Sequence, residues 1–270
     1  MDVTGAPDFV SHDSILLSHG APTPRAYLLL HGLTASPRQF ESFGRLLHER
    51  GANVFIPRLP RHGLSDRLTT ALEDLTAGEL SAFAAESAAR AAALGTGLRV
   101  VGFSVGGLLA AWIGQHVAVE WATSIAPFLG IAWVPHGLSG RMAHLALRVP
   151  NQFWWWDPIR RERQMPEHGY PRYATHAVAH AVRLAHDVLA EAEKTPPRAR
   201  HLQVILNANE STVNNPTARR LAAAWAKHRR GEVVLHHLKG LPASHDIIEP
   251  LRAPGIVDKV YPALIDLVDR

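Results

Sequence analysis

The residues that point most directly to chemistry lie near the middle of the chain, where residues 102–106 read Gly-Phe-Ser-Val-Gly. An apolar run over residues 98–103 predicts a strand before Ser104, and a second run over residues 106–117 predicts a helix after it. A serine on such a sharp turn has a strained backbone, and its hydroxyl stands above the sheet. The flanking glycines leave room for the neighbouring strand and helix. Ser104 is therefore predicted to be a nucleophile; the alternative is a serine that only caps the helix.

The elements around this turn alternate between short apolar runs and longer alanine-rich runs. The predicted strands cover residues 25–30, 52–56, 98–103, 122–125, 201–206 and 232–238, and the predicted helices cover residues 39–49, 77–94, 106–117, 217–228 and 255–269. Strands this apolar are typical of a mostly parallel sheet that helices cover on both faces. The pattern predicts an α/β fold.

The alternation stops between about residue 130 and residue 197, where tryptophan, histidine, proline and arginine become frequent. One long helix is predicted there, over residues 175–193. We expect an inserted cap at residues 131–197, and a core formed by residues 1–130 and 198–270. Tryptophan side chains in a cap bury large apolar areas, so Trp133 and Trp155 are candidate substrate-binding residues for an apolar substrate; the alternative is that they pack the cap onto the sheet.

Three motifs give the chain a resemblance to a known family. Residues 31–37 read His-Gly-Leu-Thr-Ala-Ser-Pro, residues 57–63 read Pro-Arg-Leu-Pro-Arg-His-Gly, and residues 102–107 contain the serine motif. Together they resemble the α/β hydrolase superfamily, near its esterase, monoacylglycerol lipase and serine aminopeptidase branch. Arg61 departs from this resemblance, because relatives have glycine there. The resemblance implies that His62 shapes its loop; the alternative is a second catalytic base.

The resemblance also implies where a negatively charged oxygen would be stabilised. In this family the backbone amide of the residue after His-Gly and the amide after the nucleophile form the oxyanion hole. These residues are Leu33 and Val105 in this sequence. Backbone donors make the identity of both side chains secondary.

The base and the acid follow from the order of triad residues in this fold, which is nucleophile, acid, histidine. His245 follows the last predicted strand, whereas His236 and His237 fall within that strand or at its end. The acid is expected just after the strand at residues 201–206, where Glu210 is the carboxylate of the following loop. Most relatives use aspartate at this position.

Two alternatives remain open for the acid. Asp246 is a carboxylate next to His245, although a sequence neighbour rarely faces the same imidazole. Glu210 also lies among asparagines, which favour turns, and could be a solvated loop residue. The predicted triad is Ser104, Glu210 and His245.

Composition excludes several other classes. The 270 residues are 47% hydrophobic with a net charge of +4, and the basic residues are spread along the chain, so nucleic-acid binding is not expected. The sequence has no cysteine. His176 and His180 are one helical turn apart but lack an accompanying carboxylate motif, so neither a metal site nor a cofactor is expected.

Location is predicted from two further features. The first twelve residues lack the basic start and apolar stretch of a signal peptide, which favours the cytoplasm. The apolar residues 98–134 are interrupted by glycines, Glu120 and Pro127, so no membrane-spanning segment is expected.

These observations predict an enzyme without a cofactor, a serine hydrolase of small to medium carboxylic esters, with monoacylglycerols among its candidate substrates. Reaction proceeds through an acyl-enzyme on Ser104. Thioesterase, carbon–carbon bond hydrolase and aminopeptidase activities use the same triad and remain alternatives. A non-catalytic binding protein of the same fold is the alternative from another class.

Overall fold

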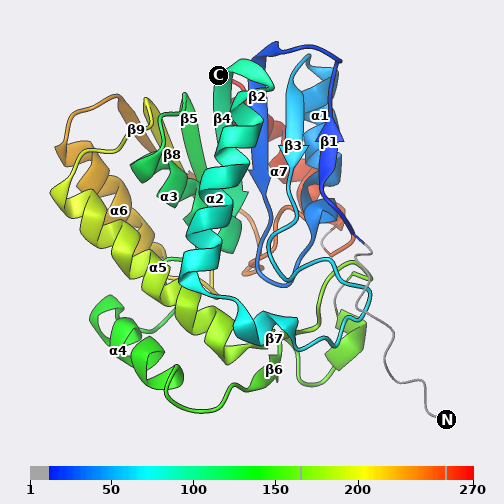
Figure 1. Ribbon diagram of the computed structural model, residues 1–270, viewed down its shortest axis with the longest axis vertical. Helices are drawn as coiled ribbons and strands as arrows, with labels where there is room; N and C mark the ends of the chain where they lie inside the picture. The colour runs from blue at the N-terminus through cyan, green and yellow to red at the C-terminus, as the bar shows by residue number, and fades with distance from the viewer. Residues whose placement is uncertain (1–11, 165, 253) are drawn as a thin grey trace.

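The computed structural model describes residues 12–164, 166–252 and 254–270, and its centre is a twisted sheet (Figure 1). In this part of the chain the sheet has seven strands in the order β1-β3-β2-β4-β5-β8-β9. The strands are β1 Ile15–Leu17, β2 Thr23–Leu30, β3 Asn53–Ile56, β4 Gly95–Phe103, β5 Trp121–Ile125, β8 His201–Asn207 and β9 Glu232–Leu238. All neighbouring pairs are parallel except β1 with β3. Toward their carboxyl ends the central strands are buried and mostly apolar, as expected of a sheet covered on both faces.

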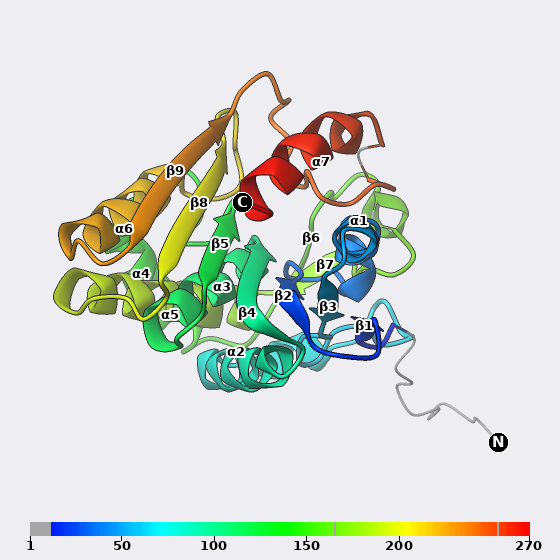
Figure 2. The same cartoon turned by 90° about the horizontal axis from the view of Figure 1, so that it is seen from above.

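Helices cover both faces of the sheet (Figure 2). The helices α1 Glu41–Glu49 and α7 Pro254–Val268 lie on one face, where the rings of Phe43 and Tyr261 pack edge to face. The other face is covered by α2 Ala77–Ala92, α3 Val105–His116, α5 Thr175–Lys194 and α6 Asn215–Lys227. This arrangement confirms the predicted α/β fold with a mostly parallel sheet.

Local signals in the sequence explain where several helices begin. The hydroxyl of Thr76 accepts the amide of Glu79 at the start of α2, and the Glu79 side chain returns a hydrogen bond to the Thr76 amide. Asn214 caps α6 by accepting the amide of Thr217, with a proline in the first turn. These caps fix the positions at which the loops from the sheet turn into helices.

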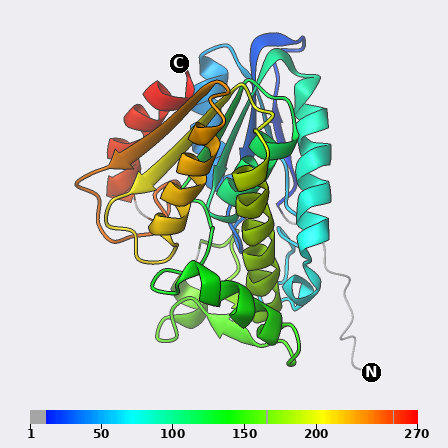
Figure 3. The ribbon, with the colours of Figure 1, turned by 90° about the vertical axis from the view of Figure 1, so that its left-hand side faces the viewer.

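The segment between β5 and α5 lies at the carboxyl ends of the strands (Figures 1 and 3). It contains α4 His136–Ala146, the 3-10 helix η3 Arg161–Gln164 and an antiparallel pair of strands, β6 Phe153–Trp155 and β7 Arg172–Ala174. Helix α5 then extends from this segment along α3 and α6. The division of the chain into a core and a cap at residues 131–197 stays a prediction; α5 contacts both parts.

The structure adds elements that periodicity did not predict. They are β1, α4, the β6–β7 pair and the 3-10 helices η1 Pro37–Phe40, η2 Ala71–Asp74 and η3. The predicted absence of a signal peptide concerns residues that, apart from His12, lie outside the described part. Within the part of the chain that the structure describes, no helix is long and apolar enough to cross a membrane.

Candidate active site

Ser104 occupies the turn between β4 and α3, and its backbone has φ 57° and ψ −117°. This positive φ is a strained conformation for a residue with a side chain. A Cβ on Gly102 would lie 1.9 Å from the carbonyl oxygen of Gly106, and a Cβ on Gly106 would lie 1.9 Å from the carbonyl oxygen of Leu30. Both flanking positions therefore require glycine, as the sequence motif implies.

The structure brings the three predicted triad residues together. The Oγ of Ser104 lies 2.8 Å from Nε2 of His245, and Nδ1 of the same imidazole lies 2.8 Å from Oε2 of Glu210. His245 lies on the loop between β9 and α7, and Glu210 lies on the loop after β8. With Nδ1 protonated, the imidazole donates to the carboxylate, and its Nε2 is free to accept the serine proton.

The Glu210 side chain is fully buried, and its carboxylate is nevertheless held ionised. Burial alone would raise its pKa, but the hydrogen bond and positive charge of His245 lower it, as do the amides of Thr212 and Val213. The net effect places the pKa of Glu210 below its ordinary value. Its Oε1 also accepts the amide of Ser211 at 2.9 Å. The carboxylate can therefore stabilise a charged imidazole at neutral pH.

Asp246, the other candidate acid, is directed elsewhere. Its Oδ2 accepts the side-chain amide of Gln39 at 2.9 Å, and its Oδ1 accepts the backbone amides of Ile248 and Glu249 at 3.1 and 3.0 Å. The His245 imidazole has its contacts with Ser104 and Glu210 instead. Of the two carboxylates, geometry favours Glu210 as the partner of the base.

Leu33 and Val105 line the same pocket as Ser104. Neither the amide of Leu33 nor that of Val105 donates a hydrogen bond within the described residues. Val105 is the first residue of α3, so its amide also carries the positive end of the helix dipole. Free donors beside a nucleophile are what stabilisation of an oxyanion requires.

The loop at residues 57–63 supports the turn that contains Leu33. The amide of Thr34 donates to Nε2 of His62 at 3.0 Å, and Nδ1 of His62 faces the Pro60 carbonyl at 2.8 Å. Burial lowers the pKa of His62 to about 4, with only part of the effect offset by the Pro60 carbonyl. His62 is therefore a neutral residue that shapes the loop. Arg61 has φ 65°, which explains why relatives place glycine there.

A pocket of about 360 Å³ opens beside Ser104 and His245. Its remaining wall is mostly apolar and aromatic, and includes Phe128, Trp133, Trp156 and Tyr173. A second, almost wholly apolar pocket of about 190 Å³ lies between α4 and α5. The two pockets share Ile131, Tyr173 and Val178 as lining residues. The two pockets are therefore neighbours, and the polar groups Ser104 and His245 line only the larger one.

The two tryptophans predicted to bind substrate have different positions. Trp133 lines the pocket at its rim, with 90% of its surface exposed. Trp155 is not among the lining residues, and the prediction moves to Trp156. Trp154 lines the apolar pocket between α4 and α5, and successive side chains of a strand point to opposite faces, so its neighbour Trp155 points away from that pocket. Trp156 follows the end of the strand. Trp156 also donates to the Thr34 hydroxyl at 2.8 Å.

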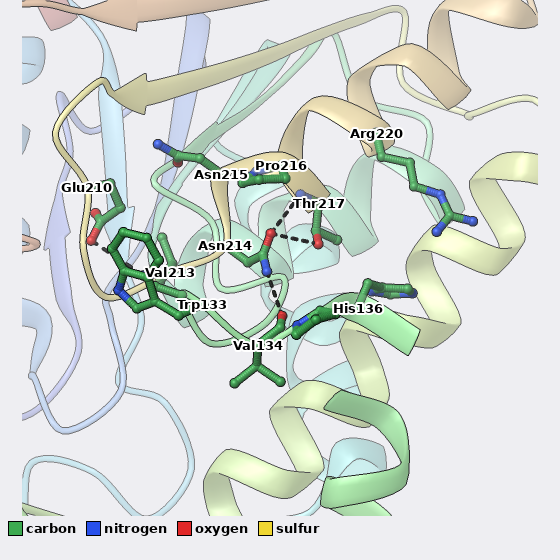
Figure 4. Close-up of a pocket in the computed structure, with 12 residues that line it drawn as sticks. Trp133, Val134, His136, Glu210, Val213, Asn214, Asn215, Pro216, Thr217 and Arg220 are labelled. Atoms are coloured by element: carbon green, nitrogen blue, oxygen red, sulfur yellow. Dashed lines mark hydrogen bonds between the residues drawn. The ribbon is translucent and has the colours of Figure 1, made fainter. Parts of the chain in front are cut away.

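A third pocket, of about 460 Å³, lies on the other side of residues 132–135 (Figure 4). Residues 132–135, here called the strap, are held by Asn214. The side-chain nitrogen of Asn214 donates to the Val134 carbonyl at 2.9 Å, and its side-chain oxygen accepts the amide of Thr217. The Ala132 amide donates to the Thr212 carbonyl at 2.9 Å. The strap is thus attached to the loop that carries Glu210.

His176 and His180 lie one helical turn apart, and the sequence predicted that they do not form a metal site. Nε2 of His176 contacts the Val149 carbonyl at 2.9 Å. Among the described residues, no group of three or more histidine, aspartate or glutamate side chains is arranged to hold a metal ion.

Comparisons with known proteins agree with this fold. A family model described as the alpha/beta hydrolase family matches residues 27–252, and the chain belongs to this family. No curated protein sequence matches the chain.

Solved structures share the fold at low sequence identity. A structure described with LipS and LipT, two metagenome-derived lipolytic enzymes, is 15% identical with a TM-score of 0.69, covering 97% of this chain and 99% of the other. The Paleococcus ferrophilus monoacylglycerol lipase is 15% identical with a TM-score of 0.69, covering 94% and 97%. A soluble variant of the Saccharomyces cerevisiae monoglyceride lipase, in complex with a substrate analogue, is 13% identical with a TM-score of 0.68, covering 100% and 97%. These likenesses establish the fold that the sequence resemblance implied.

Proposed function

We propose that this protein is a serine hydrolase that cleaves carboxylic esters through an acyl-enzyme on Ser104. The observation that carries the proposal is the chain of two 2.8 Å contacts from Ser104 through His245 to Glu210. It begins at a strained serine beside two free amides, in a pocket with a polar end. That combination supports acyl transfer.

In the proposed mechanism each residue performs a step. His245 Nε2 takes the proton of Ser104 while Oγ attacks the ester carbonyl, and Glu210 stabilises the imidazolium. The amides of Leu33 and Val105 donate to the oxyanion, with each donor worth about 3–4 kcal/mol in comparable sites. The imidazolium then protonates the leaving alcohol. Water, deprotonated by the same imidazole, releases the acid and restores Ser104.

The pockets support an ester with one apolar arm. Ile131, Tyr173 and Val178 line both the pocket beside Ser104 and the apolar pocket between α4 and α5. The hydroxyls of Ser139 and Thr175 in that pocket already have partners, His136 and Asn151 respectively. The occupant that fits is an alkyl chain, as in medium-chain esters and monoacylglycerols. Location in the cytoplasm stays a prediction from the sequence.

The decisive experiment is mass spectrometry of the intact protein after treatment with a fluorophosphonate, followed by peptide mapping. We expect a single adduct on Ser104, and none in Ser104→Ala. No adduct in folded protein would contradict the proposal and favour the non-catalytic alternative. Hydrolysis assays with matched esters, thioesters and amides of the same acyl chain then rank the alternative reactions, with the ester expected to have the highest kcat/KM.

A further inference from the structure

The base and one oxyanion donor are on different loops. His245 lies between β9 and α7, whereas Leu33 lies after β2, on the far side of Ser104 in the sheet order. Acyl transfer requires the imidazole and the oxyanion amides to hold their positions relative to one another within a fraction of an ångström. Something must therefore fix the two loops together.

One side-chain bridge joins these loops through Gln39. Its Oε1 accepts the amide of Gly32 at 2.9 Å, one residue before Leu33. Its Nε2 donates to Asp246 at 2.9 Å, one residue after His245. Gln39 and Asp246 are both buried, and a buried amide with both ends satisfied has one defined orientation.

A second bridge joins the same two loops through His168, which lies between η3 and β7. Oγ of Ser36 is hydrogen-bonded to Nδ1 of His168 at 3.1 Å, and Nε2 of His168 lies 3.0 Å from Oε2 of Glu249 in an ion-pair contact that does not have the alignment of a hydrogen bond. Ser36 belongs to the Leu33 loop and Glu249 to the His245 loop. All three side chains are buried. The hydroxyl, imidazole and carboxylate repeat the order of the candidate triad.

This second series does not have the surroundings of a catalytic site. Ser36 is completely buried, so no substrate reaches its hydroxyl. Its backbone precedes a 3-10 helix in an extended conformation with φ −141°, without the strain of Ser104. What the series does is tie three segments of the chain together.

We infer that Gln39 and His168 are positioning residues, which set the separation between the His245 imidazole and the Leu33 amide. The inference rests on the proposed function. It also explains the contacts of Asp246 and Glu249, which attach the His245 loop to Gln39 and His168 respectively. His168 belongs to the segment between β5 and α5. This segment therefore contributes to the geometry of the reaction as well as to the shape of the pocket.

The test is a double-mutant cycle in the full chain, using Gln39→Met and His168→Leu, which remove the polar contacts of both bridges and keep similar bulk. Each single variant is expected to lower kcat about tenfold, since a small misplacement costs one to two orders of magnitude, and to change KM less than twofold. The double variant is expected to lose more than the product of the single effects, because either bridge partly restrains the loops when the other is cut. Equal kcat in all variants, or strictly multiplicative losses, would overturn the inference.

Two controls separate positioning from stability. His168→Gln keeps a donor and an acceptor and is expected to recover most of the kcat lost in His168→Leu; no recovery counts against the bridge. Thr123→Val removes a buried hydrogen bond to Gln203, within the sheet and outside both bridges. It is expected to lower the melting temperature while kcat stays the same.

Failure of the inference is distinguishable from failure of the proposed function. If the wild-type protein neither hydrolyses esters nor forms a fluorophosphonate adduct, the proposed function fails. If the wild type does both and the variants do so equally fast, only the positioning role fails.

Discussion

The sheet core and the segment at residues 131–174 differ in how far their apolar side chains are buried. In the core, the central strands and α3 are buried, and backbones approach so closely that glycine is the only residue that fits at positions 102 and 106. In the segment, large apolar side chains face outward. Eight of the ten exposed large hydrophobic residues among those described lie there: Ile131, Trp133, Leu138, Met142, Leu145, Val149, Trp154 and Ile159.

This difference in burial suggests different roles for the two regions. In the proposed function the closely packed core carries Ser104, His245 and Glu210, and His168 is a contribution of the segment to their positions. The segment leaves more of its large apolar side chains exposed and forms part of the walls of the apolar pockets. We therefore expect changes in the core to alter the rate or the fold, and changes around the apolar pockets to alter which ester is preferred.

The largest effect is expected from Glu210→Gln. The substitution keeps the size of the side chain but removes the charge that stabilises the imidazolium, so kcat is expected to fall about 10³- to 10⁴-fold. Asp246→Asn is the matched comparison, because it changes the rival carboxylate in the same way. It is expected to cost about tenfold, through the Gln39 bridge. Steady-state ester hydrolysis measures both; a larger loss in Asp246→Asn would reverse the assignment of the acid.

A change in packing at the centre of the core comes next. Gly106→Ala places a methyl group 1.9 Å from the Leu30 carbonyl oxygen, so the free energy of unfolding is expected to fall by more than about 4 kcal/mol. Gly137→Ala in α4 is the matched change outside the sheet core, since nothing lies within 4 Å of its Cβ position. It is expected to leave stability unchanged or raise it by up to about 1 kcal/mol. Equal effects in urea denaturation would remove the contrast between the two regions.

Acidification is expected to weaken the core through His62. The buried imidazole has a pKa of about 4, against 6.5 for the ordinary side chain. Between these values the unfolded chain binds a proton that the folded protein excludes, so stability is present above pH 6.5 and falls as pH decreases toward 4. The loss attributable to this residue is about 3 kcal/mol. His62→Asn, whose side chain can still accept the Thr34 amide, is expected to show a flatter dependence of unfolding free energy on pH; parallel curves would contradict this account.

Ser104, His245 and Glu210, which the structure brings together, could be picked out in the sequence because each follows a recognisable strand. Ser104 lies in a motif that its own geometry requires, and His245 and Glu210 occupy loops that chain order identifies. The free amides of Leu33 and Val105 followed from the family resemblance, and side-chain patterns carry no signal for them. Trp155 was misassigned because a three-residue strand has too short a pattern to show which tryptophan faces the pocket.

The bridges through Gln39 and His168 had no signal in the sequence at all. Glutamine and histidine occur throughout the chain, and their partners are separated by 207 and 132 residues, so only the folded arrangement brings them together. The antiparallel strand β1 was missed for a related reason. With three residues, it owes its conformation to pairing with β3 more than to its own periodicity.

The smallest effect is expected at the apolar pocket between α4 and α5, where the consequence is a change in preference. Ala179→Leu adds bulk to the wall of that pocket, so it is expected to lower kcat/KM for long-chain esters about tenfold while short-chain esters react as before. Ala190→Leu, an exposed position on the same helix, is the control and should leave the profile unchanged. The measurement is kcat/KM over a series of p-nitrophenyl esters of increasing chain length. A uniform loss across the series would mean that α5 serves the reacting groups, and that the division between rate and preference does not follow the boundary of the core.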